Sequence, residues 1–122
     1  MKTDNIIIDK SFDFAVRIVN LYKHMKNTKN EYVLSKQILR SGTSVGANIN
    51  EAICGISKKD FLSKMYIAYK EILETIYWIK LLYKTDYLTE IEYNSIIEEA
   101  NEISKILSSI TKTTRIGIIP NS

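Results

Sequence analysis

Polar residues at helical spacing run through the middle of the chain and are the residues best suited to do chemistry. Arg40, Ser44, Asn48 and Glu51 follow one another at steps of three and four residues. At about 100° per residue these side chains fall on one side of a helix, beside its apolar stripe. The segment 58–84 contains a second polar group, formed by Lys64, Lys70, Glu71, Glu74 and Trp78. If the two segments pair as an antiparallel hairpin, an ion pair between Arg40 and a glutamate becomes possible.

Two interpretations of this polar stripe are open at the level of sequence. Partly buried polar pairs specify an arrangement more than they add stability, so the stripe would lock the register of helices or the geometry of subunits. The alternative is a ligand site or a nucleic-acid site. Burial and pairing of the side chains would distinguish the two hypotheses.

The residue types argue against catalysis. His24 is the only histidine and lies among lysines, while Ser44 and Cys54 have no predictable base nearby. No Glu-x-x-His pair is present for a di-iron bundle, and Glu71 with Glu74 alone is a weak metal signal. One cysteine excludes an internal disulfide and a cysteine-rich zinc site. We therefore predict a non-enzymatic protein without metal or cofactor, and a buried thiol at Cys54 in a reducing compartment.

Composition and periodicity predict a single all-α domain over residues 1–122. The chain is 45% hydrophobic and 25% charged, with four glycines and one proline. Apolar residues recur at helical spacing, and short connections favour an antiparallel up-down-up-down four-helix bundle. The expected helices span about 11–26, 34–54, 58–84 and 89–113, and residues 114–122 are expected to be a frayed tail.

Helix ends are indicated by local signals. Gly55 is expected to end the second helix in the left-handed conformation that glycine adopts freely. Ser57 with Asp60, and Thr89 with Glu92, have the spacing of a capping box, which satisfies the first amides of a helix.

The sequence also predicts how the surfaces of three helices pack, beginning with the second helix, which contains two glycines. Gly42 and Gly46 each cost about 1 kcal/mol of helix stability relative to alanine, which implies the close approach of another backbone. The first helix is expected to bury one stripe, formed by Phe12, Ala15, Ile18, Val19, Tyr22 and Met25. The third helix is apolar around much of its circumference, and its additional apolar residues are Tyr66, Leu73, Tyr77, Trp78, Leu81 and Leu82.

A helix with more apolar surface than its core can use is deeply buried or belongs to an interface. We therefore predict self-association through the third helix. The alternative is that these aromatic side chains lie on the rim of the bundle, because tyrosine tolerates partial exposure.

Charge permits a polyanionic partner without requiring one. The chain has 17 Lys and Arg against 14 Asp and Glu, a net charge of +3. The apolar run at residues 6–8 is too short for a secretory signal, and no stretch approaches the roughly 18 apolar residues of a membrane span. We expect a cytoplasmic protein without a membrane partner.

The chain resembles the 23S rRNA intervening-sequence protein family over nearly its whole length. The resemblance rests mainly on the stretches Leu39–Ala52, Ser57–Phe61, Ala68–Glu71 and Glu74–Trp78. It implies an antiparallel four-helix bundle that assembles as a homopentamer around a central channel. The accessory variability protein of diversity-generating retroelements is similar, being a basic pentameric barrel that binds its reverse transcriptase and nucleic acid.

The resemblance and the residues together support one leading hypothesis. It is a non-enzymatic homo-oligomeric scaffold, pentameric by resemblance, that binds RNA or DNA through a basic surface. The alternatives are an accessory protein of a diversity-generating retroelement and a module that binds only protein partners. A retroelement accessory protein is expected to be more basic than a net charge of +3.

Overall fold

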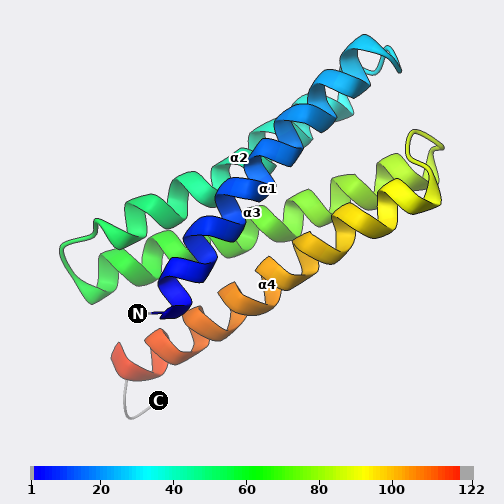
Figure 1. Ribbon diagram of the computed structural model, residues 1–122. Helices are drawn as coiled ribbons and strands as arrows, with labels where there is room; N and C mark the ends of the chain where they lie inside the picture. The colour runs from blue at the N-terminus through cyan, green and yellow to red at the C-terminus, as the bar shows by residue number, and fades with distance from the viewer. Residues whose placement is uncertain (1, 119–122) are drawn as a thin grey trace.

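Residues 2–118 of the chain fold into four antiparallel helices. The computed structural model describes residues 2–118, with side chains from residue 6 to residue 112. The helices are α1 (Lys2–Asn27), α2 (Leu34–Ile53), α3 (Lys58–Lys84) and α4 (Glu90–Ile118). Successive helices pack against each other, whereas α1 and α4 meet over a shorter stretch (Figure 1). The predicted all-α, up-down-up-down bundle is therefore confirmed.

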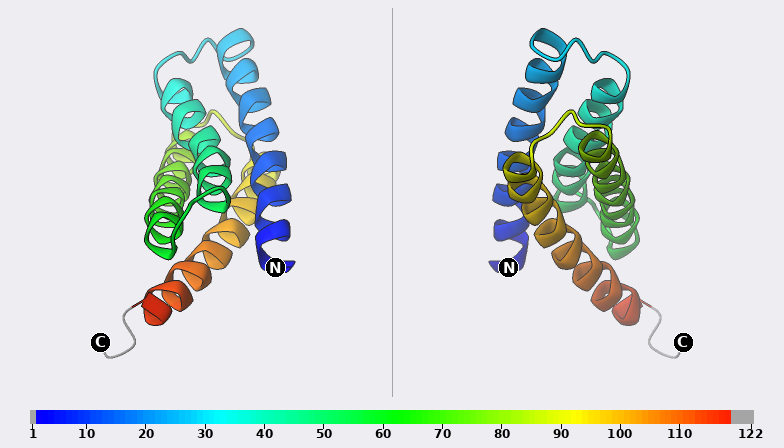
Figure 2. Two further views of the ribbon diagram at one scale, coloured as in Figure 1. Left: turned by 90° about the vertical axis from the view of Figure 1, so that its left-hand side faces the viewer. Right: turned by 90° about the vertical axis from the view of Figure 1, so that its right-hand side faces the viewer.

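The helices stand at the corners of the bundle, so that α1 and α3 lie on opposite sides of it. Both views in Figure 2 show this diagonal arrangement, with the end of α4 diverging from the other helices. In the described part of the chain, no helix is both long and apolar enough to cross a membrane.

The core stripe of α1 differs from the predicted one. Phe14 is fully buried, whereas Phe12 is 65% exposed. Ile7 is also fully buried, and Ile18 and Met25 are buried as predicted. Two apolar stripes run side by side along α1, and the positions of α2 and α4 decide which of them faces the core.

Two helices are longer than predicted. Helix α1 begins at Lys2 rather than near residue 11, because Ile7 continues the buried stripe by a further turn toward the N-terminus. Helix α4 runs to Ile118 rather than to about 113, so residues 114–118 are helical instead of frayed. Ile110 and Thr111, within the predicted span, are buried. Residues 119–122 of the predicted tail lie outside the described residues.

Helix ends confirm the predicted capping box at Thr89 in full and the one at Ser57 for the serine bond alone. The Thr89 amide donates to the Glu92 carboxylate at 2.8 Å, and the Glu92 amide donates to the Thr89 hydroxyl at 3.2 Å. The Ser57 hydroxyl accepts the Asp60 amide at 3.1 Å. Gly55, by contrast, does not adopt a positive φ.

The two residues that follow α2 differ from the prediction, Gly55 in the reason why glycine fits there and Cys54 in its burial. A side chain at Gly55 would lie 3.0 Å from the carbonyl oxygen of Ala52 and 3.3 Å from Cβ of Asp60, so glycine fits here because of space. Cys54 is exposed rather than buried, because it lies beyond the last core residue of α2, Ala52.

Gly42 and Gly46 both lie against α1, but the predicted close approach of another backbone is found only at Gly46. A Cβ atom on Gly42 would lie 2.8 Å from Cγ1 and Cγ2 of the buried Ile18. A Cβ atom on Gly46 would lie 3.4 Å from the carbonyl oxygen of Ser11. The missing side chains of α2 therefore leave room for Ile18 and for the Ser11 backbone of α1.

Candidate functional site

A polar network joins α2 to α3 and contains most of the residues singled out from the sequence. Arg40 pairs with both Glu71 and Glu74, and its Nη1 lies 3.5 Å from Oε2 of Glu71. The Ser44 hydroxyl donates to the same Glu71 oxygen at 2.8 Å. The indole nitrogen of Trp78 donates to Glu74 at 3.4 Å. We call these five residues the α2–α3 network.

The remaining predicted residues lie beside the network and differ in their contacts. Lys64 pairs with Glu51 at 3.1 Å, one step further along the same two helices. Asn48 donates to the Ser44 carbonyl at 2.8 Å, a bond within α2 rather than one that reaches α3. Lys70 is exposed on the outer face of α3 and lies outside the network.

A buried hydroxyl pair supports the network from the core side, and sequence reasoning missed it. Ser41 and Thr75 are both fully buried, and their hydroxyls hydrogen-bond to each other at 2.8 Å. Ser41 precedes the stripe residue Ser44 by three positions and so lies on the inner edge of the same helix face. This spacing was the sequence signal that could have identified it.

The side chains of the network have their hydrogen-bond partners within the protein. The Glu71 side chain is only 19% exposed and accepts hydrogen bonds from both Ser44 and Arg40. Among the described side chains, no buried nitrogen or oxygen lacks a hydrogen-bond partner. The same part of the chain has no group of three or more His, Cys, Asp or Glu residues able to hold a metal ion. The network therefore ties α2 to α3 through side chains that are paired with one another.

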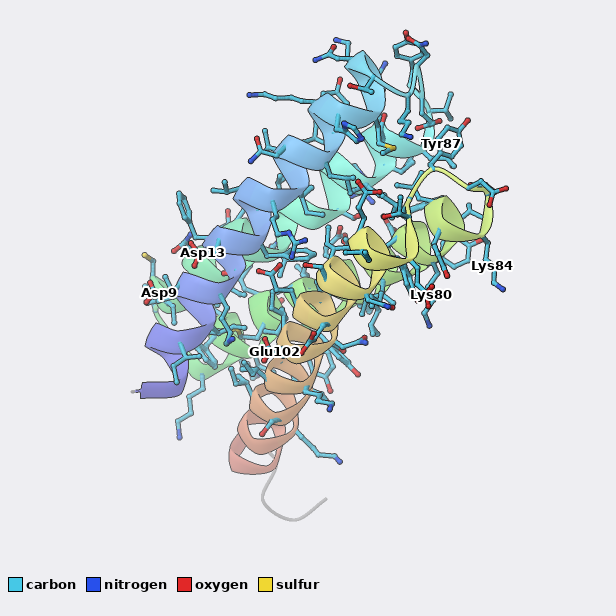
Figure 3. All side chains as sticks on the ribbon, turned by 45° about the vertical axis from the view of Figure 1, so that its right-hand side comes forward. Asp9, Asp13, Lys80, Lys84, Tyr87 and Glu102 are labelled. Carbon is cyan, nitrogen blue, oxygen red and sulfur yellow. The ribbon has the colours of Figure 1, made fainter. Side chains whose placement is uncertain are left out.

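A different surface concentrates positive charge. The α1–α2 and α3–α4 connections lie at the same end of the bundle, and α2 and α4 both begin there. Exposed lysines surround this end, and Figure 3 shows two of them projecting from α3. We call this surface the basic end; its lysines are Lys23, Lys26, Lys29, Lys36, Lys80 and Lys84.

Glu31 is a buried carboxylate at the basic end, and it organises the start of α2. It accepts the amides of Val33, Leu34 and Ser35 at 3.1, 3.0 and 2.7 Å. Its own amide donates to the carbonyl of Met25, which ties the start of α2 to the end of α1. A glutamate just before a predicted helix start was the available sequence signal.

The two capping carboxylates at the basic end stay ionised. Burial raises the pKa of Glu31, but the hydrogen bonds from three helix amides outweigh it and lower the pKa below its usual value. The hydrogen bond from the Thr89 amide lowers the pKa of Glu92 against a smaller effect of burial, and the nearby His24 and Lys29 lower it further.

A family model and a solved structure both match the chain. The model of the 23S rRNA-intervening sequence protein family matches residues 3–109. The chain belongs to this family. No curated protein matches it. A crystal structure at 1.70 Å resolution shows a similar protein from Bacteroides thetaiotaomicron VPI-5482, of the S23 ribosomal protein family and of unknown function. The two sequences are 55% identical, the match covers 90% of this chain and 98% of the other, and the TM-score is 0.88.

The family match includes the features described above. The α2–α3 network and the basic end both lie within residues 3–109 of this 23S rRNA-intervening sequence protein. The last part of α4 extends beyond the matched residues.

The apolar surface of α3 is smaller than its sequence suggested. Leu82 is fully buried in the core, so it is not part of the outer face. Leu73 and Tyr77 are 44% and 60% exposed, while Trp78 is partly covered and contacts the Tyr77 ring edge-on. Helix α3 therefore presents a short apolar strip rather than a second apolar face.

Proposed function

We propose that this 23S rRNA-intervening sequence protein is a non-enzymatic homo-oligomeric scaffold that binds RNA or DNA through its basic end. The observation that supports this proposal best is the gathering of six exposed lysines around one end of the bundle. Lysines that neutralise phosphates release counterions, which provides sequence-independent affinity.

Carboxylates at the basic end weaken this positive charge less than their number suggests. Glu31 and Glu92 are hydrogen-bonded to the first amides of α2 and α4. The start of a helix has a partial positive charge of about half an elementary charge, which offsets part of each carboxylate. Asp86 and Glu90 remain as exposed acidic residues near the α3–α4 connection.

Aromatic residues add a second mode of contact with nucleic acid. Tyr32 is 50% exposed in the α1–α2 connection. Lys26 Nζ lies 6.0 Å from the centre of the Tyr22 ring. Exposed aromatic rings beside lysines suit single-stranded nucleic acid, because unpaired bases stack on such rings.

Binding of a labelled single-stranded RNA, followed by fluorescence anisotropy, tests the nucleic-acid half of the proposal. We expect affinity to fall steeply between about 50 and 200 mM salt, because counterion release drives binding. The double variant Lys26→Glu/Lys29→Glu should bind roughly tenfold more weakly or worse and show a smaller salt slope.

The matched control changes the same charge at a distance from the basic end. Lys105→Glu/Lys112→Glu alters two exposed lysines in the second half of α4 and should leave binding near the wild-type level. Affinity that does not depend on salt, or equal losses in both double variants, would contradict the proposal. Absence of binding at any salt would favour a module that binds only protein partners.

Light scattering coupled to size-exclusion chromatography tests the oligomeric half. The subunit mass is 14.1 kDa, and we expect a native mass of several subunits, with five the number implied by the resemblance. Exposed apolar side chains on the outer faces of α1 and α3 support self-association. A monomeric wild-type protein would refute this half of the proposal.

A further inference from the structure

The outer faces of α1 and α3 each carry exposed apolar side chains and are directed away from each other. On α1, Phe12 and Val16 are 65% and 48% exposed. On α3, Leu73 and Tyr77 are 44% and 60% exposed. The two helices are diagonal neighbours that do not pack together in the described part of the chain, and Figure 2 shows them on opposite sides of the molecule.

The charges beside these two faces are opposite in sign. Asp9 and Asp13 lie beside Phe12 on α1 and are exposed. Figure 3 shows both of them on the side of the molecule opposite Lys80 and Lys84. Lys70 lies within about 60° of Leu73 and Tyr77 on α3 and is exposed. No ion pair among the described residues involves either aspartate or Lys70. Opposite charges beside apolar surface are the usual basis of complementary interfaces.

The two faces also lie at the same height along the bundle. Gly46 of α2 lies against Ser11 of α1, and Gly42 lies against Ile18. On the other side of α2, Ser44 bonds to Glu71 and Ser41 to Thr75. Residues 11–18 of α1 are therefore level with residues of α3 from just before Glu71 to Thr75.

This common height has a consequence for a ring of copies. In a ring whose axis runs along the bundle, each residue of α1 meets residues of α3 at its own level in the next copy. Asp13 would then face Lys70, and Val16 would face Leu73.

We infer that the α1 face of one copy packs on the α3 face of the next, head to tail, with Asp9 and Asp13 against Lys70. Such a heterologous contact repeats around a ring and closes it. The inference rests on the homo-oligomer of the proposed function and specifies how its copies meet.

Self-pairing of either face is disfavoured by charge. A two-fold contact between α1 faces would bring together two surfaces that each carry Asp9 and Asp13, and a two-fold contact between α3 faces would bring together two surfaces that each carry Lys70. Like charges opposed across an interface cost several kcal/mol.

The contact is confined to one half of the bundle. Further along the helices, Lys23 on α1 and Lys80 on α3 would oppose each other in neighbouring copies. Their repulsion keeps this part of the interface apart and leaves the lysines of the basic end exposed to a polyanion.

Two single variants test the pairing by light scattering. Phe12→Glu damages the α1 face and Tyr77→Glu damages the α3 face, and both positions are exposed enough for the fold to tolerate glutamate. Each variant alone should be monomeric. An equimolar mixture should form a dimer, because one intact α1 face and one intact α3 face remain to pair once.

A control variant and a charge exchange complete the test. Ile91→Glu changes an apolar side chain on α4 that is 83% exposed, and it should keep the wild-type mass. Asp13→Lys should weaken assembly roughly tenfold or more, and Lys70→Asp in the same chain should restore it. Circular dichroism of each variant verifies that the helices remain folded.

The outcomes separate this inference from the proposed function. A monomeric wild-type protein refutes the proposed homo-oligomer and with it the inference. A wild-type oligomer that survives both Phe12→Glu and Tyr77→Glu refutes only the inference. If one of the two variants is monomeric and the other forms a dimer by itself, the copies pair two-fold and the inference is refuted. Dissociation of the oligomer by Ile91→Glu would also refute the inference.

Discussion

At the scale of single residues, Glu31 shows how one buried carboxylate organises a helix start. It is 7% exposed, and its two oxygens accept three amides at the beginning of α2. The residue at the cap position, Val33, has no side-chain acceptor, so Glu31 takes that role from two residues earlier. The negative charge also interacts favourably with the start of the helix.

Replacement of Glu31 by Gln should make the stability of the protein less dependent on pH. The folded state lowers the pKa of Glu31, so its charge stabilises the fold above the unfolded pKa and ceases to do so as pH falls through the folded pKa. Glu31→Gln should therefore lower the free energy of unfolding by roughly 1 kcal/mol at neutral pH and by less near pH 3. Urea unfolding at both pH values measures this, and a difference that does not change with pH would contradict it.

At the scale of secondary-structure elements, two glycines determine how closely α1 and α2 pack, and they do so to different degrees. The position of a Cβ atom on Gly42 overlaps the buried Ile18 side chain, whereas one on Gly46 makes an ordinary contact with Ser11. Both substitutions by alanine improve helix propensity by about 1 kcal/mol, so packing decides the sign of the net effect.

Gly42→Ala should destabilise the protein, and Gly46→Ala should not. Overpacking against the buried Ile18 costs about 1–3 kcal/mol, and at contacts of 2.8 Å we expect this cost to exceed the propensity gain. Gly46→Ala should leave the free energy of unfolding unchanged or raise it by up to about 1 kcal/mol. Urea unfolding at matched protein concentration compares the two variants. Equal changes in the free energy of unfolding would contradict this prediction, because they would show that α1 and α2 pack equally tightly at both positions.

At the scale of the whole molecule, the edge between α1 and α4 closes the bundle with polar contacts. Lys10 pairs with Glu102 at 3.1 Å, and Arg17 pairs with Glu99 and donates to the Ser95 hydroxyl at 2.8 Å. These side chains are about one third to one half exposed, so each pair contributes at most about 1 kcal/mol. Since α1 and α4 also pack over a shorter stretch than the other neighbouring helices, this edge is expected to open first.

The double variant Glu99→Gln/Glu102→Gln should loosen this edge selectively. Loss of two exposed pairs, at about 0.5 kcal/mol each, should accelerate amide hydrogen exchange in α1 and α4 by roughly fivefold. Exchange in α2 and α3 should change little, because the α2–α3 network is untouched. An equal acceleration in all four helices would indicate global unfolding instead and refute the prediction.

The sequence by itself determined the number of helices, their order and the pairing of α2 with α3. The helices and their order follow from apolar periodicity and capping residues, which act within a few turns of helix, and the pairing follows from short connections and complementary charges. Arg40, Ser44, Glu71, Glu74 and Trp78 could be singled out because a polar stripe beside an apolar one has a recognisable spacing, and the fold brought them together.

Only the tertiary structure decided which of several apolar faces is buried. Phe12 and Phe14 are equally apolar, and the positions of α2 and α4 expose the first and bury the second. Position in the fold likewise exposes Cys54 and buries Leu82 and Glu31. Burial depends on contacts between residues that are distant in sequence, and local periodicity contains no information about where those distant residues lie.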